Sequence, residues 1–105
     1  MDYQSILVEV KQAVGYLRLN RPKQLNSVNV QMHEEVVQVL KAWSKDPEIR
    51  CVVISGEGRG FCAGQDLGDR VVDPNADAPD LGLSIEKFYN PLIQTIVNMP
   101  KPVIC

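Results

Sequence analysis

The sequence predicts an α/β protein, and three patterns support this fold class. Two apolar runs, Ile6–Val10 and Val14–Leu19, have the length of strands and enclose a short polar connection, as in an antiparallel hairpin. A stretch with helical periodicity follows them. A further apolar run, Cys51–Ile54, is mostly β-branched and predicts a strand that is buried on both faces. We therefore expect a helix packed on a sheet.

Composition and charge exclude several classes of partner. The chain has 105 residues, 45% of them apolar, and a formal net charge of −2, so it lacks the basic excess of a nucleic-acid binder. Its amino terminus has no basic region followed by an apolar core, and no apolar run approaches membrane-spanning length. We expect a cytoplasmic protein with no nucleic-acid or membrane partner. The cysteines lack Cys-x-x-Cys spacing and are expected as reduced thiols in small core positions: Cys51, Cys62 and Cys105.

The first helix is expected after the hairpin. Asn20–Lys23 ends the hairpin, because Pro22 cannot donate to a strand ladder, and Asn29 is a good N-cap for a helix that extends to about Lys45. His33, the only histidine, is expected at an ordinary surface or boundary position without a catalytic or metal-binding role. The apolar face of this helix recurs at three- and four-residue steps: Met32, Val36, Val37, Leu40 and Trp43.

The stretch Ile49–Leu67 holds the strongest candidate for chemistry, a glycine-rich turn directly after the buried strand. Gly56, Gly58 and Gly60 break the strand and are expected to let the backbone take positive φ, so that backbone N–H groups can approach a ligand. A Walker loop needs a Gly-Lys-Ser/Thr ending, which is absent, and in a dinucleotide fingerprint the third glycine would fall one residue before Gly64. A tight turn without a chemical role is the remaining alternative.

The segment after this turn predicts a long loop and a second helix. Residues 68–83 are rich in Asp, Pro, Ala and Gly, and their acidic residues lack the order of a calcium loop, so we expect a solvated surface loop. Ser84 is a possible cap for the helix, in which Pro91 either causes a kink or follows Asn90 as the first residue of a restarted helix. The apolar stripe of this helix comprises Ile85, Phe88, Tyr89, Leu92, Ile93, Ile96 and Val97.

The last residues predict another strand. Pro100 and Pro102 stop the second helix, and Val103–Cys105 has the composition of a buried strand. A strand that ends after three apolar residues leaves backbone groups without partners, so we expect the chain to be an amino-terminal portion of a longer protein.

The central string resembles the crotonase (enoyl-CoA hydratase/isomerase) superfamily. Val52–Leu67 reads V-V-I-S-G-x-G-x-G-F-C-A-G-Q-D-L, and Leu19–Ser27 is similar to the L-N-R-P-x-x-x-N-[AS] segment of that family. Asp46–Arg50 resembles the family's entry to the core strand, and Pro100–Ile104 its K-P-V/T-I/V segment. Within the superfamily, the region from Gly60 through Leu92 is most similar to the ring-epoxide isomerases of bacterial phenylacetate degradation.

The resemblance implies a fold and an assembly. The fold is the crotonase (ClpP-like) fold of repeated β-β-α units, incomplete at the C-terminus, with residues 1–105 forming the amino-terminal part of a crotonase-like domain. Members of the family run to more than twice this length and assemble as trimers or as dimers of trimers. We therefore expect a homo-trimer or hexamer when the protein is full length.

The resemblance also implies a site for an acyl-CoA thioester. In the family, the residue between Gly and Asp in A-G-x-D donates its backbone N–H to the thioester oxygen, on which charge develops in the enolate, and here that residue is Gln65. Its side chain is hypothesised to face the acyl group. The expected contacts to the substrate are Lys23, Leu25, Ala63, Gly64, Asp66 and Leu67. No metal or separate cofactor is expected, since coenzyme A is part of the substrate.

The narrower resemblance implies isomerisation of ring-1,2-epoxyphenylacetyl-CoA, and two alternatives stay open. One is an enoyl-CoA hydratase, and the other is a noncatalytic module that binds CoA thioesters. In the family, the second N–H donor and the catalytic carboxylate follow the matched segments, beyond residue 105. We therefore expect the 105-residue chain alone to be inactive.

Overall fold

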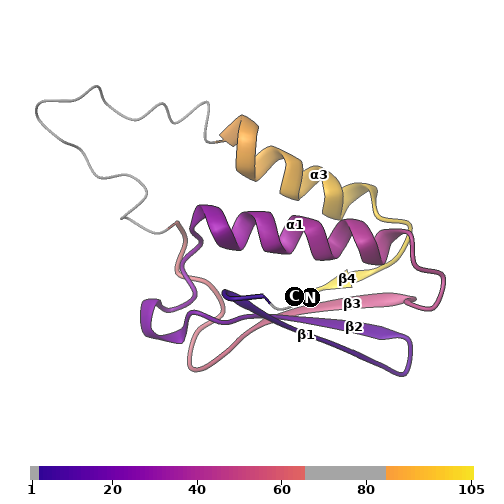
Figure 1. Cartoon of the computed structure of the whole chain (residues 1–105), viewed down its shortest axis with the longest axis horizontal. Coiled ribbons are helices and arrows are strands. Elements are labelled where there is room, and N and C mark those ends of the chain that lie inside the picture. The colour runs from indigo at the N-terminus through magenta and orange to yellow at the C-terminus, as the bar shows by residue number, and fades with distance from the viewer. Residues whose placement is uncertain (1–2, 66–84) are drawn as a thin grey trace, which may run out of the picture.

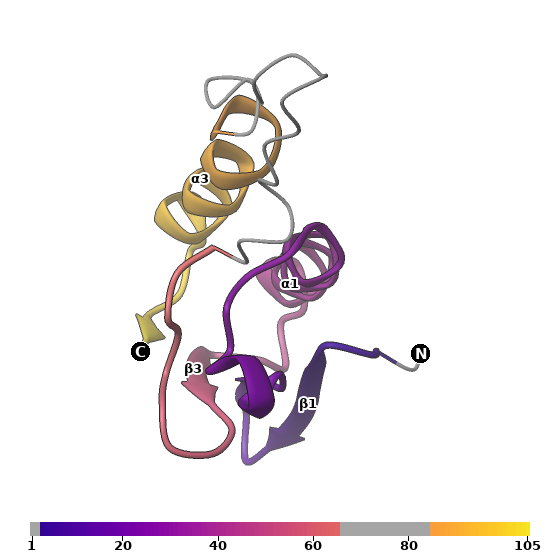
Figure 2. The same cartoon turned by 90° about the vertical axis from the view of Figure 1, so that its left-hand side faces the viewer.

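The computed structural model of the chain describes residues 3–65 and 85–105. A mixed sheet forms one layer, helix α1 covers one face of it, and helix α3 lies against α1 (Figures 1 and 2). The core lies between the sheet and α1, and its buried members include Leu17, Leu40 and Val52. The predicted α/β architecture, with a helix on a sheet, is confirmed.

Strands β1 (Ile6–Lys11) and β2 (Val14–Leu19) form the predicted hairpin. They pair antiparallel, with Ile6 opposite Leu19 and Lys11 opposite Val14. Gln12 and Ala13 connect them with φ values of 52° and 67°. Two consecutive left-handed residues are the geometry of a two-residue hairpin turn, whose twist matches that of the strands.

Strands β3 (Cys51–Gly56) and β4 (Val103–Ile104) extend the sheet in the order β1-β2-β3-β4, with β3 parallel to β2 and β4 parallel to β3. The prediction that β3 is buried on both faces is wrong: Val52 and Ile54 are buried toward α1, whereas Val53, on the other face, is half-buried. The strand expected at residues 103–105 is confirmed as β4, but the prediction that it is buried is wrong. Because β4 is the last strand of the described sheet, Ile104 is 54% exposed.

Helix α1 (Val30–Ser44) begins where the sequence predicts. The Asn29 side chain caps it, since its Oδ1 accepts a hydrogen bond of 2.9 Å from the Met32 N–H. His33 is 4% exposed, so the prediction of an ordinary surface or boundary position is wrong. Val37 is only half-buried, and Val39 takes a buried position instead.

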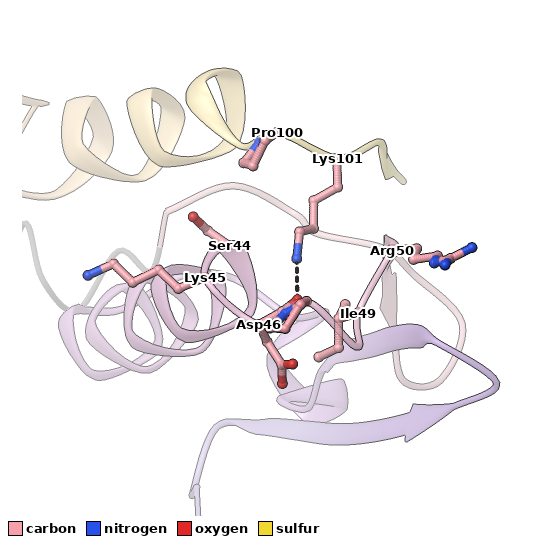
Figure 3. A pocket seen from close by; sticks show the side chains of 8 residues that line it. Ser44, Lys45, Asp46, Ile49, Arg50, Pro100 and Lys101 are labelled. Carbon is pink, nitrogen blue, oxygen red and sulfur yellow. Dashed lines mark hydrogen bonds between the residues drawn. The ribbon is translucent and has the colours of Figure 1, made fainter.

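The carboxyl end of α1 is capped by a distant side chain. Lys101 Nζ donates a hydrogen bond to the backbone oxygen of Asp46 (Figure 3) and another to the backbone oxygen of Trp43. Both oxygens also accept backbone N–H groups, that of Trp43 from Asp46 and that of Asp46 from Ile49, so the lysine adds a further bond to each and opposes the negative end of the helix dipole. The contact ties the segment before β4 to the connection between α1 and β3.

The second helix begins as a π-helix, η3 (Ile85–Tyr89), and continues as α3 (Asn90–Asn98). Pro91 lies in the first turn of α3, and Tyr89 before it has helical φ and ψ of −77° and −45°. A restart capped by Asn90 is therefore wrong, and the change from π to α geometry accommodates the proline. The apolar stripe covers the core only in part, since Leu92 and Ile96 contact it whereas Ile93 and Val97 are 53% and 72% exposed.

The cysteines and the loop after the glycine-rich turn are the two remaining features that the sequence predicted. Cys62 is half-buried and packs against the core, but Cys51 is half-buried outside it and Cys105 is exposed, so the expectation of small core cysteines is wrong for these two. The loop at residues 68–83 and the possible cap Ser84 lie outside the described residues. No helix in the described ranges is both long enough and apolar enough to serve as a membrane span.

Candidate functional site

Two loops meet at one end of the sheet. Because β2 and β3 are parallel, their carboxyl ends lie at the same edge, where Asn20–Asn29 follows β2 and Glu57–Gln65 follows β3 (Figure 1). Ligands of α/β proteins bind preferentially outside the carboxyl ends of parallel strands. The two loops at this edge of the sheet are therefore the candidate functional site.

Backbone hydrogen bonds hold the two loops together. The Ala63 N–H donates to the Leu25 oxygen at 3.0 Å, and the Val28 N–H donates to the Gly64 oxygen at 2.7 Å. Val28 and Gln65 form an isolated parallel bridge. Because the Val28 N–H bonds to Gly64, the residue before Gln65 in this parallel bridge, the N–H of Gln65 is directed away from Val28.

The glycines of the second loop have two different functions. Gly58 and Gly64 adopt positive φ, 83° and 111°, which L side chains rarely adopt. Gly56 and Gly60 do not, so that part of the prediction is wrong for them. Gly56 is required by close approach instead: a Cβ there would lie 2.5 Å from the backbone oxygens of both Gly60 and Phe61.

The sequence-predicted site residues fall into three groups. Leu25, Ala63, Gly64 and Gln65 come together where the loops meet, and Leu25 and Ala63 line a hollow of about 280 Å³ with Arg59, Gly60, Phe61 and Cys62. Lys23 lies on the same first loop, in the short 3₁₀ helix η1 (Pro22–Gln24), with an exposed side chain. Asp66 and Leu67 lie outside the described residues.

Leu25 has an unusual backbone for its residue type. It ends η1 in the left-handed region, with φ 51° and ψ 36°, and its side chain is 37% exposed. Left-handed backbone is uncommon for leucine and clusters at ligand-binding positions. The conformation turns the Leu25 carbonyl toward Ala63, which fixes the entry to the segment Ala63–Gln65.

The side chain of Gln65 contacts the second helix. The Tyr89 hydroxyl donates a hydrogen bond of 3.0 Å to Gln65 Oε1. The His33 ring meets the Tyr89 ring edge-on at a centroid distance of 4.3 Å and stacks on Phe88 at 5.7 Å. Sequence reasoning missed Tyr89, because its position in an apolar helical stripe gives no signal for this contact.

Asn26 is the other residue that sequence reasoning left without a role. It is fully buried at 0% exposure, and its side chain hydrogen-bonds to both loops. Asparagine in a loop next to a proline is typical of turn geometry, but the two groups to which its Nδ2 donates lie more than thirty positions away.

Charge at this edge is modest. Arg18 Nη1 and Glu57 Oε2 form an ion pair of 2.7 Å across β2 and the glycine turn. The hydrogen bond that Arg18 donates to Glu57, and then the negative charge of Glu57, raise the pKa of the Arg18 guanidinium above its ordinary value. Both side chains are exposed, so the pair adds little to stability.

Within the described ranges, no cluster of three His, Cys, Asp or Glu side chains could hold a metal ion.

The fold and the position of the two loops define a class of protein. It is that of α/β proteins in which the loops after parallel strands present backbone groups at the carboxyl edge of the sheet. The chain belongs to the enoyl-CoA hydratase/isomerase family, whose profile matches residues 14–105.

Relatives and a solved structure agree with this assignment. The chain is 55% identical over 100 residues to the 1,2-epoxyphenylacetyl-CoA isomerase of Escherichia coli K12, an alignment that covers 95% of this chain and 38% of that protein. It is 35% identical over 104 residues to a probable enoyl-CoA hydratase of Rhodobacter capsulatus, which covers 99% of this chain and again 38% of the relative. A crystal structure of an enoyl-CoA hydratase from Mycobacterium marinum superposes with a TM-score of 0.77 at 33% identity, covering 97% of this chain and 47% of that one. The crotonase fold implied by the sequence is therefore confirmed.

Proposed function

We propose that this chain supplies one wall of the thioester site of an acyl-CoA isomerase, with 2-(1,2-epoxy-1,2-dihydrophenyl)acetyl-CoA as the substrate. The observation that carries the proposal is the segment Ala63–Gln65, whose backbone is held on the Leu25–Val28 loop at the carboxyl edge of the sheet. The 55% identity to the E. coli isomerase favours this substrate over other thioesters.

The chemistry follows from what a thioester carbonyl requires. Removal of a proton next to the carbonyl gives an enolate, so negative charge develops on the thioester oxygen. The Gln65 N–H is the proposed donor to that oxygen, and a fixed donor of this kind is worth about 10²–10³ in rate. Because the donor belongs to the backbone, its position depends on how firmly the loop is held rather than on the Gln65 side chain.

The remaining contacts would hold the rest of the substrate. Leu25, Ala63 and Gly64 are proposed to contact the coenzyme A moiety, and small residues at 63 and 64 leave room for its approach. Lys23 would add a cationic contact from η1. Asp66 and Leu67 complete the proposed contacts, and no metal or separate cofactor is part of the proposal.

The protein is further proposed to be cytoplasmic and, at full length, a homo-trimer or hexamer, without nucleic-acid or membrane partners. The chain spans 38% of the length of the E. coli and R. capsulatus relatives. Activity is therefore tested on the full-length protein, meaning the complete product of the gene that encodes this chain.

A hydratase is the second candidate, favoured by the similarity to the R. capsulatus protein. The two reactions separate by product mass, because isomerisation leaves the mass of the thioester unchanged and hydration adds one water. The full-length protein is incubated with the epoxyphenylacetyl, a Δ3-enoyl and the crotonyl thioester of coenzyme A. A product of unchanged mass from the first substrate supports the proposal, and hydration of crotonyl-CoA alone would replace it with the hydratase. Binding of all three without turnover would favour a noncatalytic module.

The role of the Gln65 backbone has its own test. Gln65→Pro removes the N–H, whereas Gln65→Ala keeps it and removes only the side chain. We expect kcat to fall by about 10²–10³ in the proline variant and much less in the alanine variant. Equal losses in the two variants would show that the side chain, not the N–H, carries the effect.

A further inference from the structure

We propose that Asn26 is a positioning residue that fixes the glycine-rich turn, so that the backbone from Ala63 to Gln65 is in place before the substrate binds. The inference concerns the geometry of the loop, and its link to catalysis rests on the proposed function. Asn26 is 0% exposed and touches no substrate in the proposal. It would act only through the segment that it holds.

The carboxamide of Asn26 joins the two loops through every one of its polar atoms. Its Oδ1 accepts from the Arg21 N–H at 2.8 Å, and its Nδ2 donates to the backbone oxygens of Glu57 and Gly60 at 2.9 and 2.8 Å. Its own N–H donates to the Arg21 oxygen at 2.8 Å, so backbone and side chain both bond to Arg21. A buried amide with all these bonds made has one orientation, because any rotation leaves a buried polar group unsatisfied.

The first loop is rigid enough to serve as a support. Arg21 Nη1 donates to the Ser27 oxygen at 2.6 Å, which closes the loop on itself, and η1 lies within it. Asn26 adopts left-handed backbone with φ 58°, a conformation that asparagine tolerates better than most residues. The first loop is thus held by bonds within itself, and the turn after β3 is positioned by its bonds to that loop.

Gly56 allows the turn and the Asn26 side chain to approach closely. A Cβ at this position would lie 2.8 Å from Asn26 Nδ2 and 2.5 Å from the oxygens of Gly60 and Phe61. The two oxygens to which Asn26 donates come from both limbs of the turn, Glu57 before its tip and Gly60 after it. Three residues further on the chain reaches Ala63, so a displacement of Gly60 is carried into the proposed donor segment.

The test uses Asn26→Asp in the full-length protein. Aspartate keeps the shape and the acceptor for the Arg21 N–H, but it replaces the two donated bonds by repulsion between a carboxylate and two carbonyl oxygens. The matched control is Val39→Ala, a substitution at a 3% exposed core position of α1 that lowers stability without touching either loop. Hydrogen exchange of the peptides that contain Val28 and Ala63, whose N–H groups bond across the loops, reports the positioning directly.

We expect exchange of these peptides to accelerate at least about tenfold in Asn26→Asp and to stay near wild type in Val39→Ala. We expect kcat to fall about 10²-fold in Asn26→Asp with KM changed by less than about threefold, because a displaced donor weakens the transition state more than the bound substrate. If Asn26→Asp does not fold, Gly56→Ala, which displaces the same turn by crowding, is measured with both readouts.

Wild-type exchange and kcat in a folded variant, or losses equal to those of Val39→Ala, would overturn the inference. Absence of turnover in the wild-type protein would instead refute the proposed function. The exchange rates would then decide on their own whether Asn26 positions the turn.

Discussion

Gln65 presents two groups whose effects are separable, a backbone N–H and a side chain held by Tyr89. The Tyr89 hydroxyl bonds to Gln65 Oε1 at 3.0 Å, and the buried His33 ring supports Tyr89 edge-on. A glutamine fixed in this way has one orientation of its carboxamide, whereas an unsupported one samples several rotamers. If the side chain faces the acyl group, Tyr89 influences which acyl group fits.

Replacing Tyr89 by Phe tests this point. The substitution removes one hydroxyl and keeps the ring contact with His33, so stability should fall by only about 1 kcal/mol. We expect the ratio of kcat/KM for the epoxyphenylacetyl thioester to that for a linear Δ3-enoyl thioester to drop about fivefold, the equivalent of one hydrogen bond. Tyr16→Phe on the far face of the sheet is the control, since Tyr16 is 39% exposed and distant from the loops. An unchanged ratio would mean that the Gln65 side chain does not contact the acyl group.

At the scale of single elements, α1 organises the chain at both of its ends and along its length. Glu35 on α1 accepts hydrogen bonds from the N–H groups of Gln4 and Ser5 at 3.0 and 2.9 Å, and from the Ser5 hydroxyl. These bonds fix the residues that lead into β1. Burial alone would raise the pKa of Glu35, but the hydrogen bonds from Gln4, Ser5 and Gln31 outweigh it and lower the pKa below its ordinary 4.5.

A lowered carboxyl pKa makes stability depend on pH with a known sign. The contribution of Glu35 is present above its ordinary value of 4.5 and is lost as the pH falls through the lowered pKa. We expect Glu35→Gln to lower the free energy of unfolding by about 1 kcal/mol at neutral pH, a modest value because solvent reaches the carboxylate. Urea unfolding at neutral pH and at about pH 3 should show this difference shrinking in acid. Glu34→Gln, at the exposed neighbouring position, is the control, and a difference that persists in acid would contradict the assignment.

Local patterns predicted the elements well, and contacts between distant segments account for what they missed. The hairpin, the Asn29 cap and β3 follow from periodicity and turn residues within a few positions of each other. The burial of His33 depends on η3, which lies more than fifty positions further on, and no local pattern encodes it. The need for glycine at position 15 also depends on a distant segment. A Cβ there would lie 2.7 Å from the Trp43 ring, a contact that exists only because β2 packs on α1.

For the candidate site, the motifs predicted which loop residues lie together, whereas the roles of these residues stay predictions. The motifs indicated Leu25, Ala63, Gly64 and Gln65, and the structure brings these residues together. The family segment Leu19–Ser27 includes Asn26 but predicts no role for it, because the groups to which its side chain bonds belong to the backbone of other residues. Backbone partners leave no trace in residue identity.

At the scale of the whole molecule, the described residues contain the proposed donor segment and its support, which are only part of what enolate chemistry needs. A proton must be moved by a base, and the charge on the thioester oxygen is best held by two donors. The family resemblance places the second donor and the carboxylate outside the matched motifs. The chain also spans only 38% of the E. coli and R. capsulatus relatives.

We therefore expect the isolated 105-residue chain to show no turnover of epoxyphenylacetyl-CoA or crotonyl-CoA, while the full-length protein turns over at least one of them. One donor without a base leaves proton removal to water, and losing general base catalysis alone costs about 10²–10⁴ in rate. Circular dichroism must first establish that the isolated chain is folded, so that inactivity reflects missing groups rather than missing structure. Product formation by the folded chain is then followed by mass spectrometry, with the Gln65→Pro form of the same chain as the control for contaminating enzyme. Turnover that the proline substitution abolishes would mean that these 105 residues carry their own base, and the search for it would move to the carboxylates beside Gln65.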